Sequence, residues 1–180
     1  MTPLAPSLSA LVRLRAERPE AVAEAAARRT RRRLIRHPGD RLMIIAADHP
    51  ARGALAVGDR SLAMANRFEL LERLCLALSR PGVDGVLASA DVLDDLLLRP
   101  PPAHRGQPQR VAPLPVRGVL LGADLAADQD AAYGKWRDAL RLPTVRGLVV
   151  GRSLLYPVDG DVTLAVDTAV SLLRPGRDGP

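Results

Sequence analysis

With 180 residues, 47% of them hydrophobic, the chain is long enough to bury the core of one globular domain. It contains no apolar run near the ~20 residues that a membrane-spanning helix needs, and its N-terminal residues lack the apolar block of a secretory signal. The single cysteine, Cys75, excludes an internal disulfide framework and a cysteine-rich metal site. We therefore expect a cytoplasmic protein with no metal, no other cofactor and no membrane partner.

The formal net charge of +6 is unevenly distributed along the sequence. Arginines concentrate in the stretch 28–36, and such a cluster can bind nucleic acid through its phosphates. However, aromatic residues make up only 2% of the chain, and no known nucleic-acid-binding motif is present. A solvated helix face is the favoured interpretation, and nucleic-acid binding is an alternative. The arginines concerned are Arg28, Arg29, Arg31, Arg32, Arg33 and Arg36.

Short apolar runs alternate with helical patterns from residue 42 onward. The run LMIIAA at 42–47 is continuous, as in a strand that is buried on both faces. Strands that alternate with helices are parallel, with right-handed crossovers. We predict an α/β fold with about four parallel strands, at 42–47, 85–88, 118–122 and 147–151. Helices are predicted at 7–16, 19–36, 61–79, 89–98, 128–142 and, with Asp161 as its cap, 162–173.

One local signature recurs before three of these strands. Residues 81–87, 115–120 and 143–149 each contain a proline, a valine, a charged residue, a glycine and an apolar pair, in that order. The physical interpretation is one reused unit, in which a helix stops, a short loop follows and a buried parallel strand begins. This repetition strengthens the prediction of a parallel sheet.

The stretch 99–117 interrupts the alternation. It contains six prolines and no apolar periodicity, which is typical of an extended or disordered connector. Structureless loops longer than about 12–15 residues are uncommon inside compact domains. The predicted organisation is N-terminal helices over 1–40, two βα units over 41–98, the connector, two more βα units over 118–174 and a disordered tail over 175–180.

Asp48 and His49 directly follow the first predicted strand. In parallel α/β proteins the reacting groups lie at the carboxyl ends of strands. A carboxylate beside an imidazole can exchange protons with a substrate there, and the alternative is that both side chains only cap the loop. Since neither His37 nor His104 lies at a strand end, no second histidine ligand is apparent and we expect no metal site.

Two further strand ends carry features of an anion site. Gly151 and Arg152 follow the last predicted strand, and Gly122 ends the one before it. A glycine lets the backbone approach a ligand, and the forked cation of arginine suits phosphate. In (β/α)8 barrels, phosphate often binds between the loops after the last two strands. The alternative is that these glycines serve only tight turns.

Three segments carry a resemblance to a known family: MIIAADHPARGALAVGDR, FELLERLCLALSRPGVDGVLASADVLDDLLL and YGKWRDALRLPTVRGLVVGRSLLYPVDGD. They resemble an actinobacterial group of aldolase-like (β/α)8 proteins that is often labelled deoxyribose-phosphate aldolase. More distantly, they resemble archaeal-type class I fructose-bisphosphate aldolases. The resemblance implies a carbon–carbon lyase that acts on sugar phosphates or polyol-derived sugars through a Schiff base.

The same resemblance assigns roles to individual residues. It implies that Asp48 is the acid/base residue and that Gly151 and Arg152 bind phosphate. His49 matches the Asp-His end of the family's first strand, so we expect it, together with Gly122, to contact the substrate or its phosphate. The chain departs from the family at the residue after Gly122, which is alanine where the family tends to have a second glycine.

The chain also departs from that family in its middle. Its segments match the first two and the last two βα units, so the implied fold is an incomplete TIM (β/α)8-type barrel. The missing units include the strand that carries the Schiff-base lysine. The only lysine, Lys135, lies in the predicted helix 128–142 and cannot replace it, while arginine stays protonated. We therefore expect aldolase activity to be absent or severely impaired.

Several alternatives remain open at this point. The protein can be a non-catalytic remnant that binds a sugar phosphate, or a nucleic-acid-binding module built on the arginine-rich stretch 28–36. The open edges and the exposed apolar face of a four-stranded arc favour a homo-oligomer. The composition of the connector is consistent with a real internal deletion and equally with a shifted reading frame.

Overall fold

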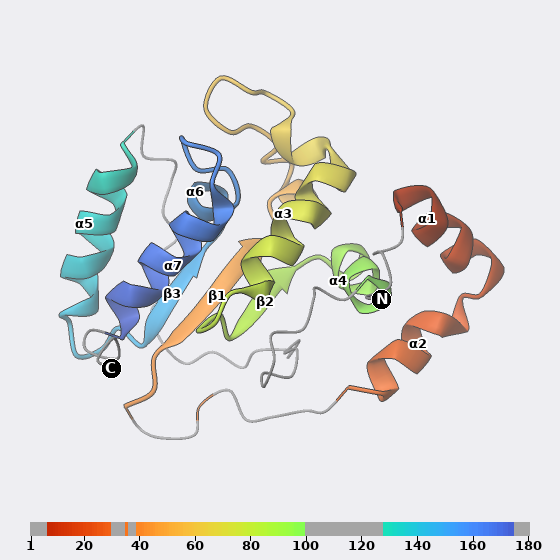
Figure 1. The fold of residues 1–180 in the computed structure, drawn as a ribbon, viewed down its shortest axis with the longest axis horizontal. Helices are drawn as coiled ribbons and strands as arrows, with labels where there is room; N and C mark the ends of the chain where they lie inside the picture. The colour runs from red at the N-terminus through yellow and green to blue at the C-terminus, as the bar shows by residue number, and fades with distance from the viewer. Residues whose placement is uncertain (1–6, 30–34, 36–38, 100–127, 175–180) are drawn as a thin grey trace.

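The computed structural model describes residues 7–29, 35, 39–99 and 128–174 (Figure 1). Within them the protein is an α/β structure built on one open, parallel, three-stranded sheet. Its strands are β1 (Leu42–Ala47), β2 (Gly85–Ala88) and β3 (Gly147–Val150), which match three of the four predicted strands. The fourth, at 118–122, lies outside the described residues, as do the connector from residue 100 onward and the tail at 175–180.

β1 occupies the centre of the sheet, whose strand order is β2-β1-β3. Along one edge it pairs in parallel with β2, the next strand in the chain, with Ile44 opposite Gly85. Along its other edge it pairs in parallel with β3, the last strand, with Leu42 opposite Gly147. The first strand is therefore flanked by its immediate successor and by the last strand of the described chain, and the carboxyl ends of all three lie at one edge of the sheet.

Seven α-helices flank the sheet in the described part of the chain. α3 and α7 pack against β1 and against each other, with α5 on the far side of α7 and α4 beside α3 (Figure 1). α1 and α2 continue this layer beyond α4. The helices are α1 (Leu8–Glu17), α2 (Glu20–Ala27), α3 (Arg67–Ser79), α4 (Ala90–Leu98), α5 (Gln129–Leu140), α6 (Arg152–Leu155) and α7 (Val162–Leu173), with short 3₁₀ turns η1 (Pro50–Arg52) and η2 (Ala63–Ala65).

The side chains of β1 are buried on both faces of the sheet. Alternate residues belong to the main core beneath the helix layer, and the others belong to a second, smaller cluster on the opposite face. A strand that is buried on both faces needs a continuous apolar run, which the sequence has at 42–47. The main core contains Met43, Ile45 and Ala47, and the second cluster contains Leu42, Ile44, Ala46 and Val149.

The glycine that recurs before the strands has a steric reason at β3. Gly147 has a φ angle of 155°, and a Cβ there would come within 2.2 Å of the Leu42 carbonyl oxygen. Only glycine lets β3 begin so close to β1. In the recurring unit before β2, the charged residue is Asp84, and it is buried. Its Oδ2 accepts a 3.0 Å hydrogen bond from the N–H of Met43 in β1.

Two helices differ in extent from the prediction. The helix predicted at 61–79 begins only at Arg67, because Asn66 caps it by accepting the Glu69 N–H at 3.1 Å, and residues 63–65 form a separate 3₁₀ turn. The helix predicted at 19–36 ends at Ala27. Of the arginine-rich stretch 28–36, the structure describes Arg28, which pairs with a glutamate of α2 at 3.8 Å, and the half-buried Arg29.

Two C-terminal helices, α5 and α7, match the predictions at 128–142 and 162–173 closely, whereas the short helix α6 is not among the predicted helices. Asp161 caps α7 by accepting the Leu164 N–H at 3.0 Å. On α5, Trp136 is buried in the core whereas Lys135 is exposed, as the helical spacing indicates. Among the helices described, none combines the length and apolar character needed to cross a membrane.

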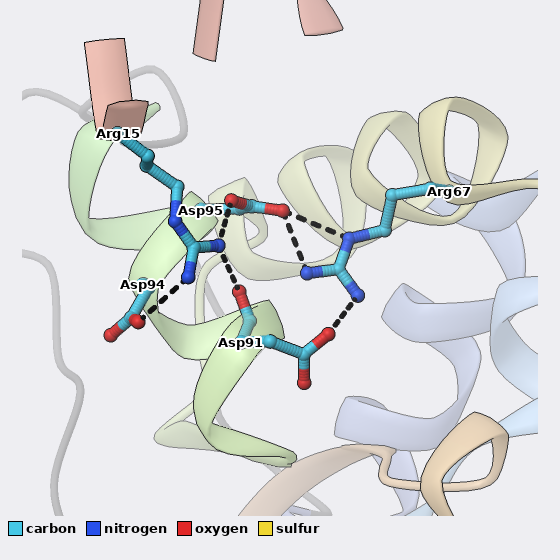
Figure 2. A network of polar contacts seen from close by, with 5 residues as sticks. All are labelled: Arg15, Arg67, Asp91, Asp94 and Asp95. Carbon is cyan, nitrogen blue, oxygen red and sulfur yellow. Dashed lines mark hydrogen bonds and ion pairs between the residues drawn. The ribbon is translucent and has the colours of Figure 1, made fainter. Parts of the chain in front are cut away.

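A network of charged side chains attaches α1 to the rest of the molecule (Figure 2). At its centre is Asp95 of α4, which is 5% exposed. Its Oδ1 accepts a 2.8 Å hydrogen bond from Arg15 of α1, and its Oδ2 accepts bonds of 2.7 and 2.9 Å from Arg67 of α3. Asp94 and Asp91 pair with the same two arginines at the edge of the network. One buried carboxylate thus joins three helices.

Candidate functional site

Four of the five predicted site residues meet at the carboxyl ends of β1 and β3. The pairing of Ile45 with Val150 sets the ends of these two strands side by side. The fifth predicted residue, Gly122, lies outside the described residues. The four that the structure brings together are Asp48 and His49 after β1, and Gly151 and Arg152 after β3.

Gly151 packs directly on the end of β1. A Cβ at this position would come within 2.4 Å of the Ala46 carbonyl oxygen and within 2.5 Å of Cε1 of His49. Real Cβ atoms essentially never make such short contacts, so a side chain here would push the two strand ends apart. The sequence predicts that this glycine serves the approach of a ligand or a tight turn, whereas the structure shows that it lets the chain after β3 approach the His49 ring.

Asp48 is held by an arginine from the following turn. Arg52 Nε lies 3.0 Å from one carboxylate oxygen of Asp48, and its Nη2 donates to the other at 3.3 Å. The side chain of Asp48 is 27% exposed, so solvent and small molecules can reach it. Arg52 is not among the predicted site residues, although its position four residues after Asp48, in a region of helical turns, is the signal that identifies such a pair.

His49 lies against these charged groups with little access to solvent. Its side chain is 13% exposed, and its Nδ1 is buried without a hydrogen-bond partner in the described part of the chain. The nearest Asp48 oxygen is 3.9 Å from Nδ1, beyond hydrogen-bond distance. Burial lowers the pKa of His49, Asp48 opposes that shift, and the positive charges of Arg152 and Arg52 add to it. The imidazole is therefore neutral near pH 7, with one ring nitrogen unused.

Arg152 begins the short helix α6 and also contacts the loop after β1. Its Nη1 donates a 3.2 Å hydrogen bond to the carbonyl oxygen of Ala56. The next residue, Ser153, is 3% exposed, and its Oγ has no hydrogen-bond partner among the residues described. Buried hydroxyls are nearly always hydrogen-bonded in proteins, so this one is notable. Ser153 is not among the predicted site residues, because its burial follows only from the packing of α6.

The chemical groups at this site suit an anion better than a metal. Across the described residues, no group of three or more His, Cys, Asp or Glu side chains lies close enough to hold a metal ion. Among the described residues, the ends of β1 and β3 instead present one carboxylate, one imidazole and two guanidinium groups. Guanidinium groups bind oxyanions through paired hydrogen bonds, and the carboxylate and imidazole can exchange protons.

Lys135, the only lysine of the sequence, is not part of this site. It is exposed on α5, which packs on α7 in the outer helix layer (Figure 1). The buried face of α5 is formed instead by Ala132, Trp136 and Leu140. The strand ends therefore contain guanidinium and imidazole groups but no amine side chain.

Comparisons with known proteins place the chain in a family. The model of the Cgl0159-like family matches residues 40–100 and 107–170, which include both strand ends described above. The crystal structure of Cgl0159 from Corynebacterium glutamicum (Brevibacterium flavum) is similar, with a TM-score of 0.74 and 30% sequence identity over 93% of this chain and 99% of that chain. No curated protein matches the sequence. The chain belongs to the Cgl0159-like family.

Proposed function

We propose that this protein binds a sugar phosphate at the carboxyl ends of β1 and β3, and that it is related to class I aldolases but has little or no Schiff-base activity. The observation that carries the proposal is the packing of Gly151 on His49. This contact fixes Arg152 beside a carboxylate and an imidazole, which is the combination that a phosphorylated, hydroxyl-bearing ligand requires.

Arg152 is the group that we assign to the phosphate. Its guanidinium presents paired N–H donors in a plane, a geometry that matches two phosphate oxygens. Arg52 is already engaged with Asp48 at 3.0 Å, and Arg152 contributes the second guanidinium group of the site, with its Nη1 bonded to the carbonyl oxygen of Ala56. Ser153 follows Arg152 in α6, where its hydroxyl is buried.

Asp48 and His49 are the groups that we assign to the sugar. Asp48 is accessible to solvent and can accept hydrogen bonds from sugar hydroxyls or take a proton from one. His49 is neutral near pH 7 because burial and the neighbouring arginines lower its pKa. A neutral imidazole can complement a polar ligand without adding charge, through the part of the ring that reaches solvent.

We further propose that the sheet is part of an incomplete (β/α)8-type barrel. The support lies in the position of β1, which pairs with the following strand on one side and with the last strand on the other. In a closed parallel barrel, the first strand has these same two neighbours. The packing of α3 and α7 together on one face of the sheet also fits a barrel, because doubly wound sheets place helices on both faces.

The impairment of catalysis follows from the position of the only amine side chain. A Schiff-base aldolase needs a lysine inside the ring of strands, where it can attack the carbonyl group of the substrate. Lys135 is exposed on an outer helix, and the strand ends hold arginines, which cannot form an iminium ion. The residues at the strand ends can bind a ligand and exchange protons with it. None of them is an amine that could attack the carbonyl group of a substrate.

Calorimetry with 2-deoxyribose 5-phosphate, and with 2-deoxyribose as the unphosphorylated control, tests this proposal. We expect the phosphate ester to bind at least about tenfold more tightly than the free sugar, because charge-assisted hydrogen bonds to phosphate are the strongest contacts available. Arg152→Gln should weaken that binding by about tenfold, whereas Arg137→Gln, which removes an exposed arginine of α5, should not change it. Equal affinities for the two sugars, or equal effects of the two substitutions, would contradict the proposal.

A further inference from the structure

We propose that a cavity between α5 and α7 is a binding site for a small organic ammonium ion with an apolar body. The cavity has a volume of about 530 Å³ and lies beside the first turn of α5 and the loop that joins α6 to α7. Binding sites for small molecules span roughly 300–1,000 Å³. It shares no residue with the site at the strand ends, so this inference does not rest on the proposed function.

Apolar side chains form much of the cavity wall. Val158 is 78% exposed and Leu164 is 55% exposed, and both line the cavity. The ring of Tyr133 lines it as well, while the hydroxyl of this residue accepts a 3.0 Å hydrogen bond from Gln129 and donates one of 3.3 Å to the Ala165 carbonyl oxygen. The hydroxyl is therefore already engaged within the protein. Exposed apolar groups that gather at a concave surface indicate a binding site more strongly than scattered ones.

Apart from Tyr133, the ionisable side chains that line the cavity in the described chain are all carboxylates: Asp128, Asp130 and Asp159. Two of them use one oxygen locally, since Asp128 accepts the N–H of Asp130 at 2.9 Å and Asp159 accepts the N–H of Asp161 at 3.0 Å. No lysine or arginine of the described chain forms an ion pair with any of the three. The cavity is thus negatively charged on a protein whose net charge is +6.

These features together determine the charge and the shape of the ligand. Three carboxylates repel an anion, although the N-terminus of α5 by itself would attract one. An ammonium group gains from the three carboxylates that line the cavity. A bare metal ion would gain nothing from the apolar walls. A primary amine attached to an aromatic or branched aliphatic group can contact both the apolar side chains and the carboxylates of the cavity.

A hydrogen bond joins the cavity to the short helix α6, which follows β3. Gln129, whose side chain bonds the Tyr133 hydroxyl, also donates from Nε2 to the carbonyl oxygen of Ser153 at 2.9 Å. Gln129 lines the cavity, and Ser153 directly follows Arg152 of the site at the strand ends. Their ligands have opposite charges, so binding at each can be measured separately, and failure at one site leaves the other proposal intact.

Binding of 2-phenylethylamine to the full chain, with 2-phenylethanol as its uncharged counterpart, tests the inference. Nuclear magnetic resonance of isotope-labelled protein reports the location, and we expect the amine to shift the signals of Val158 and Leu164. Calorimetry reports the affinity, which should be at least about fivefold higher for the amine than for the alcohol. The double variant Asp130→Asn and Asp159→Asn should lose that preference, whereas Asp138→Asn, on the exposed face of α5, should retain it.

A second variant addresses the apolar wall. Leu164→Ser removes a side chain that is 55% exposed, so the variant should fold, which thermal unfolding can verify. It should weaken the binding of both probes, because both place the same phenyl ring against this wall. The inference is overturned if the amine does not bind or if the alcohol binds equally well. It is also overturned if Asp138→Asn reduces the preference for the amine as much as the double variant does, or if Leu164→Ser leaves the affinity for the amine unchanged.

Discussion

Arg15 of α1 donates a 2.8 Å hydrogen bond to Oδ1 of Asp95 on α4, although the two residues are 80 positions apart in the sequence. The side chain of Asp95 is 7% exposed, whereas that of Asp94, which contacts the same arginine, is 33% exposed. Arg67 neutralises the second oxygen of Asp95 at 2.7 Å. The buried carboxylate therefore depends on cations from two other helices, and those helices depend on it for their relative position.

Replacement of the central carboxylate should destabilise the fold. We predict that Asp95→Ala lowers the free energy of unfolding by about 3 kcal/mol, because it leaves Arg15 and Arg67 partly buried without their shared partner. Asp94→Ala removes a more exposed partner of Arg15 and should cost less than about 1 kcal/mol. Urea unfolding of the two variants measures the difference, and similar losses in both would show that Asp95 is not the centre of the network.

The close packing of the two strand ends leads to a second prediction. Gly151→Ala places a methyl group within 2.4 Å of the Ala46 carbonyl oxygen and 2.5 Å of the His49 ring. The substitution should lower the free energy of unfolding by about 1–3 kcal/mol, as overpacking commonly does, and it should weaken sugar-phosphate binding.

Gly134→Ala is the matched control for this substitution. Gly134 lies within α5, and a Cβ there would meet no atom within 4 Å. The change should raise stability by about 0.5–1 kcal/mol, since alanine is favoured over glycine in helices. Thermal and urea unfolding would contradict the interpretation of Gly151 if its alanine variant were as stable as that of Gly134.

Local patterns in the sequence were sufficient to predict much of the fold. The continuous run at 42–47 is a strand buried on both faces, and the spacing of apolar residues after Asp161 is the helix α7. The start of α3 was not predicted, because the residues from 61 onward continue a helical pattern that the Asn66 cap interrupts. Local propensity does not reveal which of several polar residues will cap a helix.

Contacts between distant parts of the chain account for what could not be predicted. The two arginines that bond to Asp95 lie 28 and 80 residues away from it in the sequence. The residues adjacent to Asp95 in the sequence therefore do not indicate that this carboxylate will be buried. Asp48 and Arg152 were predicted as site residues from their positions after strands. Their proximity depends on the pairing of β1 with β3, and the burial of the Ser153 hydroxyl depends on the packing of α6.

The electrostatic surroundings of His49 lead to a third prediction. Its pKa should lie below the ordinary value of 6.5, because burial disfavours the charged imidazole. Asp48→Asn removes an attractive charge and should lower the pKa further, whereas Arg152→Gln removes a repulsive one and should raise it. Titration of the histidine signals by nuclear magnetic resonance measures all three values. A pKa above 6.5, or an increase in Asp48→Asn, would contradict this description of the site.

The same shift links the stability of the protein to pH. Between the lowered pKa and 6.5, the unfolded chain binds a proton at His49 and the folded chain does not, so the free energy of unfolding rises with pH in that window. This contribution is fully present above about pH 6.5 and declines as the pH falls toward the folded-state pKa. His49→Gln should remove this pH-dependent contribution. Urea unfolding between the lowered pKa and pH 6.5 measures how steeply the free energy of unfolding changes with pH.

The final prediction concerns the only lysine and decides whether the aldolase chemistry survives. An amine attacks a carbonyl group in its neutral form, and enzymes secure that form by burying the lysine or by placing another cation beside it. Lys135 is exposed on α5 and lies outside the strand ends that hold Asp48 and Arg152. Borohydride reduction in the presence of 2-deoxyribose 5-phosphate should therefore trap no substrate-dependent adduct on this residue, and Lys135→Arg should leave sugar-phosphate binding unchanged. A trapped adduct on Lys135 that accompanies measurable turnover, with both lost in Lys135→Arg, would show that the amine reaches a substrate and that the proposed loss of Schiff-base activity is wrong.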